Sequence, residues 1–362
     1  MTPSRSSSER LQYLDWVRGA AAVTMLQGHV FDSFTRNDLR ADGAFVYSQF
    51  LGGMPPAIFL LLTGVTFAFL MDSNERKGIA PGMRWLTALK RSGYLFALAF
   101  AFRLQLWLFS QPAPWMDLFK VDILNCMGFA MVILSPMALF KTTERIRLCA
   151  VLGVAIAFAS PLVSQVNWQF VPEHLRHYFV PDYRFFGLFP WGAFLAFGMS
   201  AGSMIRRIPE EGIERAMQWG ALAGGAIILV SQHFSSLPYS IYSKSDYWLN
   251  SPALVLTKLG VVLLILALGF AWTRYGAGTG WSWVRQFGTT SLLVYWVHIE
   301  LVYGRWFPTF KNSLSVPETI VAAICVILMM LGLSLIRTNY TRLGGLAANM
   351  RLWPSPRPAQ GD

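Results

Sequence analysis

The chain has 362 residues, of which 54% are hydrophobic and only 14% charged, and its mean hydropathy is +0.43. A soluble domain carries roughly a quarter of charged residues, so this composition excludes an ordinary soluble protein. The formal net charge of +11 does not indicate a nucleic-acid-binding protein, because the basic residues lie mostly in short connections between apolar runs. The long, non-alternating apolar runs predict an all-α, polytopic membrane protein.

About ten apolar segments are long enough to cross a membrane. In chain order they are residues 12–34, 50–71, 85–109, 119–140, 147–166, 183–205, 216–234, 252–273, 285–307 and 317–337. The connections between them are too short to hold a soluble domain. We therefore expect one transmembrane domain over residues 12–337, a short cytoplasmic segment over residues 1–11, and a cytoplasmic tail over residues 338–362 that its prolines make partly disordered.

The loop charges predict the orientation of the chain. The N-terminus, every second loop and the C-terminus together hold 17 Lys and Arg residues, whereas the opposite loops hold 8. Cytoplasmic loops are enriched in these residues, so both termini are predicted to be cytoplasmic, with an even number of spans. The polar start of the chain does not resemble a cleavable signal peptide, and we expect an integral protein of a bacterial inner membrane.

Two ionisable residues lie inside the first apolar segment, and they are Arg18 and His29. Eleven helical steps of about 100° come to three turns plus roughly 20°, so both side chains project from one face, about 16 Å apart along the axis. An ionisable side chain inside a membrane helix is costly and usually functional. This pair predicts a site that is reached from both sides of the membrane.

Each of these residues has a carboxylate three positions away. Asp15 precedes Arg18 and can offset its burial, while Asp32 follows His29 and can orient the imidazole, which suits a general base. The alternative is structural: Asp15, Arg18 and Asp32 would be helix-end residues whose charges reach the interface, and His29 a satisfied interior histidine.

A second histidine lies in the ninth segment. His298 sits halfway or further along a helix that runs outward, so it can meet His29 in the same layer, whereas Glu300 points elsewhere. A structural role for His298 is an equally open reading. Three further positions inside apolar segments, at Arg103, Asn125 and Trp191, are candidates for contacts with an acceptor substrate.

Basic residues also gather at the predicted cytoplasmic ends of the segments. Lys90 and Arg91 lie near the inner end of the third segment, and with Arg18 they are candidates for holding a nucleotide phosphate. Binding of anionic lipid headgroups is the alternative. Together with Arg76, Lys77 and Arg84, these residues could form one positive patch that faces the cytoplasm.

The three cysteines lie in apolar runs without the spacing of metal ligands, and we expect no metal site. The chain also lacks a glycine-rich phosphate loop and the Gly-x-Ser-x-Gly elbow of hydrolases. Glycines at 198 and 202 have the spacing of a close helix–helix contact.

Five motifs in order along residues 12–310 resemble the transmembrane acyltransferases, namely the acyltransferase-3 family and the related catalytic domain of heparan-alpha-glucosaminide N-acetyltransferase. The motifs are LDWVRG with His29 (14–29), FLLLTGV (59–65), DILNCMG (122–128), FPWG (189–192) and GTTSLLVYWVH (288–298). The resemblance implies transfer of an acyl group, often acetyl, from cytoplasmic acyl-CoA to a hydroxyl or amine of a glycan or glycolipid beyond the membrane. By position, Arg18 and His29 correspond to the essential pair of the family, and His298 to its late histidine.

These observations favour a membrane-embedded O- or N-acyltransferase. Its catalytic residues would be His29, Asp32 and His298, and its donor would be acetyl-CoA or another acyl-CoA, held by Arg18, Lys90 and Arg91. A transporter or flippase for a glycan or lipid-linked substrate is the main alternative, and it would use Arg18 and His29 as substrate or proton-relay sites. A non-catalytic sensor or scaffold is a third possibility.

Overall fold

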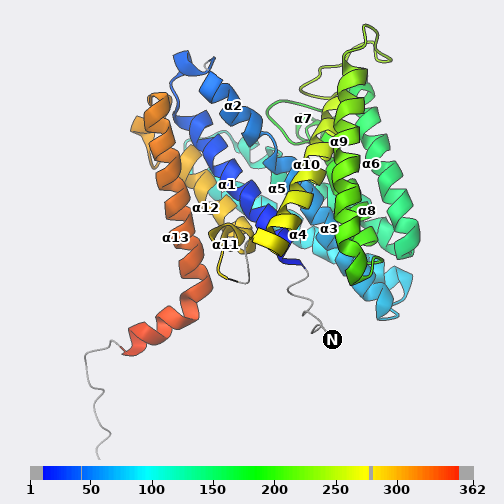
Figure 1. Cartoon of the computed structure of the whole chain (residues 1–362). Coiled ribbons are helices and arrows are strands. Elements are labelled where there is room, and N and C mark those ends of the chain that lie inside the picture. The colour runs from blue at the N-terminus through cyan, green and yellow to red at the C-terminus, as the bar shows by residue number, and fades with distance from the viewer. Residues whose placement is uncertain (1–10, 42, 277–279, 350–362) are drawn as a thin grey trace, which may run out of the picture.

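The computed structural model describes residues 11–41, 43–276 and 280–349, and within these ranges it is helical with no sheet (Figure 1). The helices are α1 (Gln12–Phe34), α2 (Gly43–Gly52), α3 (Pro55–Arg76), α4 (Pro81–Phe109), α5 (Ile123–Leu134), α6 (Thr142–Gln165), α7 (Glu173–Arg176), α8 (Leu188–Ile205), α9 (Ile213–Ser235), α10 (Pro252–Ala271), α11 (Trp283–Thr289), α12 (Ser291–Tyr303) and α13 (Val316–Asn349). The all-α prediction is confirmed for the described residues.

Every predicted segment contains a helix, but the count of ten spans is not established. Six helical stretches in the described part of the chain are long and apolar enough to cross a membrane: Gly43–Arg76, Pro81–Phe109, Thr142–Gln165, Leu188–Ile205, Pro252–Gly276 and Val316–Tyr340. α1 and α9 have 23 residues each, but they are not among these six. Ile123–Leu139 and Ser291–Tyr303 are apolar but shorter.

Two predicted segments contain an interruption instead of one continuous helix. Pro55 and Pro56 begin α3, and the preceding helix α2 ends at Gly52, so the helix is interrupted between these residues. The ninth segment is likewise divided, into α11 and α12 at Thr290. Both breaks lie beside the cavities described below, where non-helical backbone is tolerated in a membrane protein.

The last helix extends into the segment that the sequence predicts as a tail. α13 continues to Asn349 instead of ending near residue 337, because the first proline of the tail stands only at position 354. The rest of the predicted tail, residues 350–362, and most of the predicted N-terminal segment, residues 1–10, lie outside the described residues.

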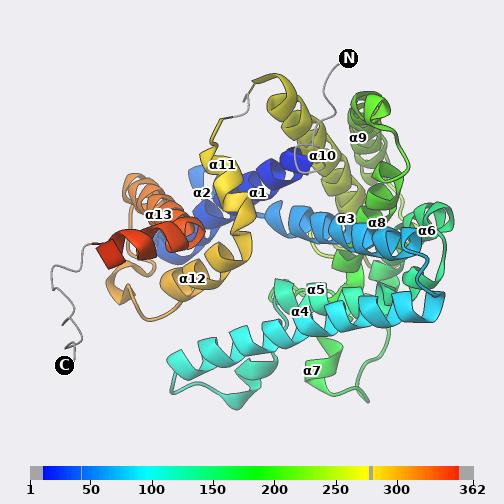
Figure 2. The ribbon, with the colours of Figure 1, turned by 90° about the horizontal axis from the view of Figure 1, so that it is seen from below.

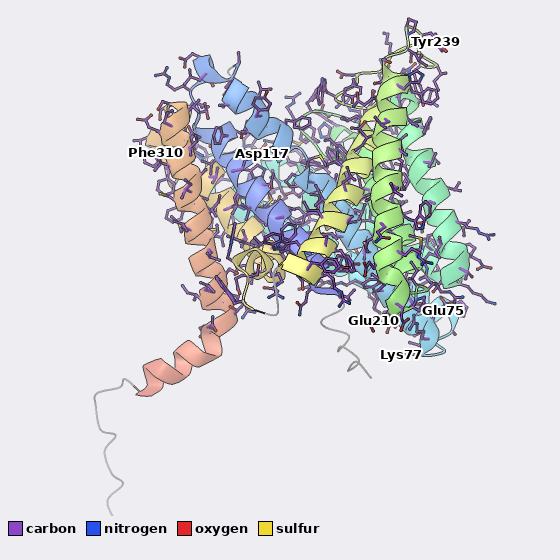
Figure 3. The ribbon with its side chains drawn as sticks, viewed as in Figure 1. Glu75, Lys77, Asp117, Glu210, Tyr239 and Phe310 are labelled. Atoms are coloured by element: carbon purple, nitrogen blue, oxygen red, sulfur yellow. The ribbon has the colours of Figure 1, made fainter. Side chains whose placement is uncertain are left out.

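The start of α1 and the end of α13 lie at the same side of the molecule (Figure 1). Glu75, Lys77 and Glu210 lie on that side, and Tyr239 and Phe310 lie on the opposite side (Figure 3). We call these the inner and outer sides, since the loop charges predict that the first faces the cytoplasm.

The helices pack as two groups, seen from the inner side in Figure 2. One buried cluster joins α1 to α11, α12 and α13 and includes Leu26, Phe34 and Phe287. A larger cluster joins α3, α5, α6, α8 and α10. α1 contributes to both clusters, so it lies at the junction of the two groups.

The glycine expected to permit close packing does so between α3 and α8. A Cβ atom added to Gly198 would lie 2.0 Å from the backbone oxygen of Leu61, and one added to Gly64 would lie 2.1 Å from that of Leu195. Neither helix can move away without losing its packing, so only glycine fits at these positions. This contact fixes the position of α3, which lines both cavities.

A dense group of charges joins α3, α4, α6 and α8 near the inner side, and we call it the ionic cluster. It consists of Asp72, Glu75, Arg76, Arg84, Thr142, Arg145 and Arg206. Glu75 lies 3.0 Å from the fully buried Arg145 and 3.3 Å from Arg84, and Asp72 accepts a 2.7 Å hydrogen bond from Arg206. Two residues of the predicted positive patch, Arg76 and Arg84, thus pair with carboxylates of α3.

Candidate active site

His29 of α1 and His298 of α12 form a direct pair. Nδ1 of His29 lies 2.9 Å from Nε2 of His298, and the two rings are stacked at an interplanar angle of 11°. His298 is fully buried, whereas His29 is partly exposed. The expectation that both histidines lie in one layer is confirmed, although 269 residues separate them in the chain.

The partners of His298 fix the hydrogens of the pair. Nδ1 of His298 lies 2.8 Å from the backbone oxygen of Val294, and a carbonyl oxygen only accepts, so this nitrogen carries a hydrogen. When His298 is neutral its Nε2 is then an acceptor, and Nδ1 of His29 must donate to it. Neutral His29 is left with an unprotonated Nε2, which is the atom that a general base needs.

Asp32 does not orient His29 as the sequence predicted. Its Oδ2 accepts a 2.8 Å hydrogen bond from the hydroxyl of Tyr303, and its Oδ1 lies 3.8 Å from Nη1 of Arg40. The ring of Tyr303 in turn packs edge-on against His29, with centroids 5.4 Å apart. Tertiary contacts with α12 and the α1–α2 connection replace the expected local contact, so Asp32 holds Tyr303, which packs against His29.

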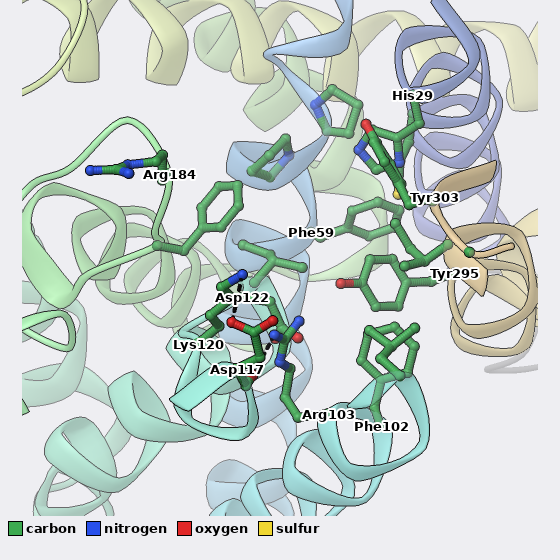
Figure 4. A pocket seen from close by; sticks show the side chains of 18 of the residues that line it. His29, Phe59, Phe102, Arg103, Asp117, Lys120, Asp122, Arg184, Tyr295 and Tyr303 are labelled. Atoms are coloured by element: carbon green, nitrogen blue, oxygen red, sulfur yellow. Dashed lines mark hydrogen bonds and ion pairs between the residues drawn. The ribbon is translucent and has the colours of Figure 1, made fainter. Parts of the chain in front are cut away.

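A cavity of about 470 Å³ opens beside His29, and we call it the outer cavity (Figure 4). Its polar wall is formed by His29, Tyr303, Arg103, Asp117, Lys120, Asp122 and Arg184. Aromatic and apolar side chains form the remaining wall, including Phe59, Phe102, Trp107, Phe186 and Tyr295. The size and the mixture of an apolar wall with a few polar groups are typical of a small-molecule site.

Two residues that line the outer cavity each contain a buried polar atom without a hydrogen-bond partner among the described residues. Arg103 donates through Nη2 to the backbone oxygen of Asp117 at 2.6 Å, while its buried Nε has no hydrogen-bond partner within the described residues. Asp122 caps α5 through Oδ1, and its buried Oδ2 is likewise unpartnered in the described part of the chain. Both residues line the outer cavity, but these two atoms are themselves buried.

A second cavity of about 670 Å³ lies toward the inner side, and we call it the inner cavity. Arg18 and Arg91 line it, together with Thr63, Thr66, Ser291 and a largely apolar wall. Arg18 is held by Asp15 at 3.0 Å, as the spacing of these residues predicted. Lys90 is exposed and does not line this cavity. Of the three cations predicted to bind the donor, only Arg18 and Arg91 therefore line the inner cavity.

Two predicted acceptor contacts lie away from both cavities. Asn125 is buried and its Nδ2 lies 3.4 Å from the hydroxyl of Tyr178, while Trp191 packs against Phe186 with ring centroids 5.1 Å apart. Neither residue lines the outer or the inner cavity. Of the three predicted acceptor residues, only Arg103 does so.

Sequence reasoning missed Lys258 of α10. Its Nζ donates to the backbone oxygen of Gly53 at 3.0 Å and lies 4.9 Å from the ring centroid of Trp191. It therefore holds the break between α2 and α3, beside Gly52 and Pro55 in the wall of the outer cavity. A single lysine inside an apolar segment was the only signal that the sequence offered.

No three His, Cys, Asp or Glu side chains among the described residues are grouped as metal ligands would be.

Comparison with known proteins gives one family. The family model described as heparan-alpha-glucosaminide N-acetyltransferase, catalytic, matches residues 10–242. The match includes Arg18, His29 and Arg103, whereas His298 lies beyond its end. None of the curated proteins that were compared matches the chain. Because the matched residues form more than half of the chain, this protein belongs to the heparan-alpha-glucosaminide N-acetyltransferase catalytic-domain family of membrane proteins.

Proposed function

We propose that this protein transfers an acyl group, most simply acetyl, from acyl-CoA in the inner cavity to a hydroxyl or amine in the outer cavity. The observation that carries the proposal is the His29–His298 pair, which leaves Nε2 of His29 unprotonated beside the outer cavity. The family implies acetyltransferase activity. The CoA donor, the glycan acceptor and the direction across the membrane are part of the proposal.

The chemistry follows from the positions of the hydrogens. The acceptor oxygen or nitrogen attacks the thioester carbonyl, and Nε2 of His29 takes its proton. A new C–O or C–N bond forms as the C–S bond breaks, and CoA leaves as a thiolate that takes up the proton. His298 shares the positive charge that develops on His29 through the 2.9 Å contact, and the backbone oxygen of Val294 holds His298 in place.

The two ends of the substrates would meet different groups. Arg18 and Arg91 in the inner cavity supply positive charge for the phosphates of CoA, which approach from the cytoplasm. Arg103 and Asp122 line the outer cavity, where hydroxyl groups of a glycan or glycolipid would lie. We place the protein in a bacterial inner membrane, with membrane lipids around its apolar helices.

The test is release of CoA from acetyl-CoA by the purified protein in nanodiscs, with and without crude envelope glycans. We expect release that requires glycan and falls by about 10²–10⁴-fold in His29→Ala, the range for loss of a general base. His233→Ala, in the exposed last turn of α9, is the matched control and should release CoA at the wild-type rate. Transport of a glycan without consumption of acetyl-CoA would overturn the proposal in favour of a transporter.

A further inference from the structure

The outer and inner cavities share part of their walls. Of the side chains that line either cavity, three line both, and they are Phe59 of α3, Ile123 of α5 and Tyr295 of α12. We call these three side chains the partition. Ile123 and Tyr295 are each only 9% exposed and Phe59 is half-buried, so the partition is a layer of apolar and aromatic groups.

Each helix crosses from one cavity to the other at its partition residue. On α12, Ser291 lines the inner cavity, Tyr295 lines both, and Ile299 and Tyr303 line the outer cavity, at a constant spacing of four residues. Side chains four residues apart lie above one another on a helix. The two cavities are therefore consecutive parts of one path along α12, interrupted by a single layer.

α3 shows the same order in the opposite direction. Pro55 and Pro56 line the outer cavity, Phe59 lines both, and Thr63 lines the inner cavity one turn later. On α5, Ile123 lines both cavities and Met127 lines only the inner one. Three helices thus place their transition at the same level.

The partition lies next to the histidine pair. The ring of Tyr295 contacts His298 with centroids 5.8 Å apart, and Phe102 supports Tyr295 from the outer cavity at 5.3 Å. A thioester that entered from the inner cavity would have to place its carbonyl at this layer to come within reach of His29. Any acyl carbons beyond the carbonyl would have to fit among the partition side chains.

We propose that Phe59, Ile123 and Tyr295 separate the two compartments and select the length of the acyl chain, so that the transferred group is short. This inference rests on the proposed acyl transfer and adds a specificity-determining layer to it. One methylene group in an apolar pocket changes discrimination by about 10- to 200-fold. The wild-type protein should accordingly prefer acetyl-CoA to butyryl-CoA by at least about 10-fold in kcat/KM.

The first test is the ratio of kcat/KM for butyryl-CoA to that for acetyl-CoA. Phe59→Ala removes the ring from the partition and should raise this ratio by about 10-fold or more. The matched control is Phe69→Ala, ten residues further along α3 at a position that lines neither cavity, and it should leave the ratio unchanged. A ratio reports on the folded fraction alone, so partial unfolding of a variant does not affect it.

A second test needs no catalytic activity. Thr63→Cys is made in a Cys325→Ser background, because Cys325 is the exposed native thiol whereas Cys126 and Cys149 are buried. A small, charged, membrane-impermeant methanethiosulfonate reagent should label position 63 from the inner side only, in vesicles of known orientation. With Phe59→Ala added, labelling should occur from both sides, and with Phe69→Ala it should stay one-sided.

The two tests separate the possible failures. Labelling of Thr63→Cys from both sides with Phe59 intact, or from one side still after Phe59→Ala, would overturn the partition. An unchanged butyryl-to-acetyl ratio in Phe59→Ala would overturn length selection while leaving acyl transfer in place. Absence of CoA release by the wild-type protein would instead count against the proposed function, and the labelling result would stand independently of it.

Discussion

Two polar regions in the same membrane protein are built in opposite ways. In the ionic cluster, carboxylates bind several partners at once: Asp72 accepts from Thr142 and Arg206, and Glu75 accepts from Thr142 and Arg145. In the histidine pair, one buried contact leaves a ring nitrogen of His29 unused, beside a cavity. The residues of the ionic cluster line neither the outer nor the inner cavity.

The difference indicates how polar groups in a membrane protein should be interpreted. Charge alone does not identify a functional site, since the ionic cluster contains four arginines and joins helices. What distinguishes His29 is that it lines the outer cavity and that the histidine pair leaves its Nε2 unprotonated. Substitutions at His29 should therefore lower the rate of CoA release without changing the free energy of unfolding. Substitutions in the ionic cluster should lower the free energy of unfolding without changing the rate.

The largest effect is expected for the histidine pair. His29→Gln and His298→Gln should each slow CoA release by about 10²–10⁴-fold, and the double variant should be no slower than the worse single one, because the two side chains act as a unit. Steady-state rates with thermal unfolding measured alongside provide the check. Losses that multiply in the double variant would mean that the histidines act separately.

Glu75→Gln tests the other region. It removes the carboxylate that faces the buried Arg145 and Arg84, and loss of one partner from a buried ion pair costs about 3–5 kcal/mol of stability. We expect a lower Tm and an unchanged rate per folded molecule. Glu210→Gln, exposed on the same side of the molecule, should shift the unfolding free energy by less than about 0.5 kcal/mol.

A smaller loss of stability is expected for Gly198→Ala. The added Cβ would meet the backbone oxygen of Leu61 at 2.0 Å, and overpacking of this kind costs about 1–3 kcal/mol. Gly220→Ala in α9 is the control, because an added Cβ there meets nothing within 4 Å and alanine favours helix. Equal Tm values for the two variants would contradict the close contact between α3 and α8.

The smallest effect is expected around Asp32. Because Asp32 holds the hydroxyl of Tyr303, whose ring packs against His29, Tyr303→Phe and Asp32→Asn should each lower kcat by about 10-fold, which corresponds to about 1.4 kcal/mol. A double-mutant cycle on kcat should show strong coupling. Independent effects would instead support a direct action of Asp32.

Local periodicity predicted much of the fold and part of the site. The apolar runs located the helices, three-residue spacing predicted the Arg18–Asp15 pair, and the direction of the ninth segment placed His298 in the layer of His29. These predictions succeeded because they depend on one helix at a time, or on the relative direction of two helices.

The errors arose where side chains from distant helices compete for one group. Asp32 was assigned to His29 by spacing, but Tyr303 and Arg40 bind it instead. Spacing along the chain also does not show that Arg84 pairs with Glu75, which lies on a different helix. Asn125 and Trp191 interrupt apolar runs as substrate contacts would, yet they pack against Tyr178 and Phe186. One sequence does not contain the tertiary distances that decide such cases.

The separation of His29 and His298 in the chain has a consequence for biogenesis. A ribosome delivers α1 to the membrane long before α12 exists, because synthesis proceeds from the N-terminus. Until α12 arrives, His29 lacks the partner that holds it in the finished protein, and a polar side chain in hydrocarbon is costly. The histidine pair therefore cannot form in a nascent chain until α12 has been made. A ribosome that stalls before residue 298 should therefore leave a product in which His29 lacks this partner.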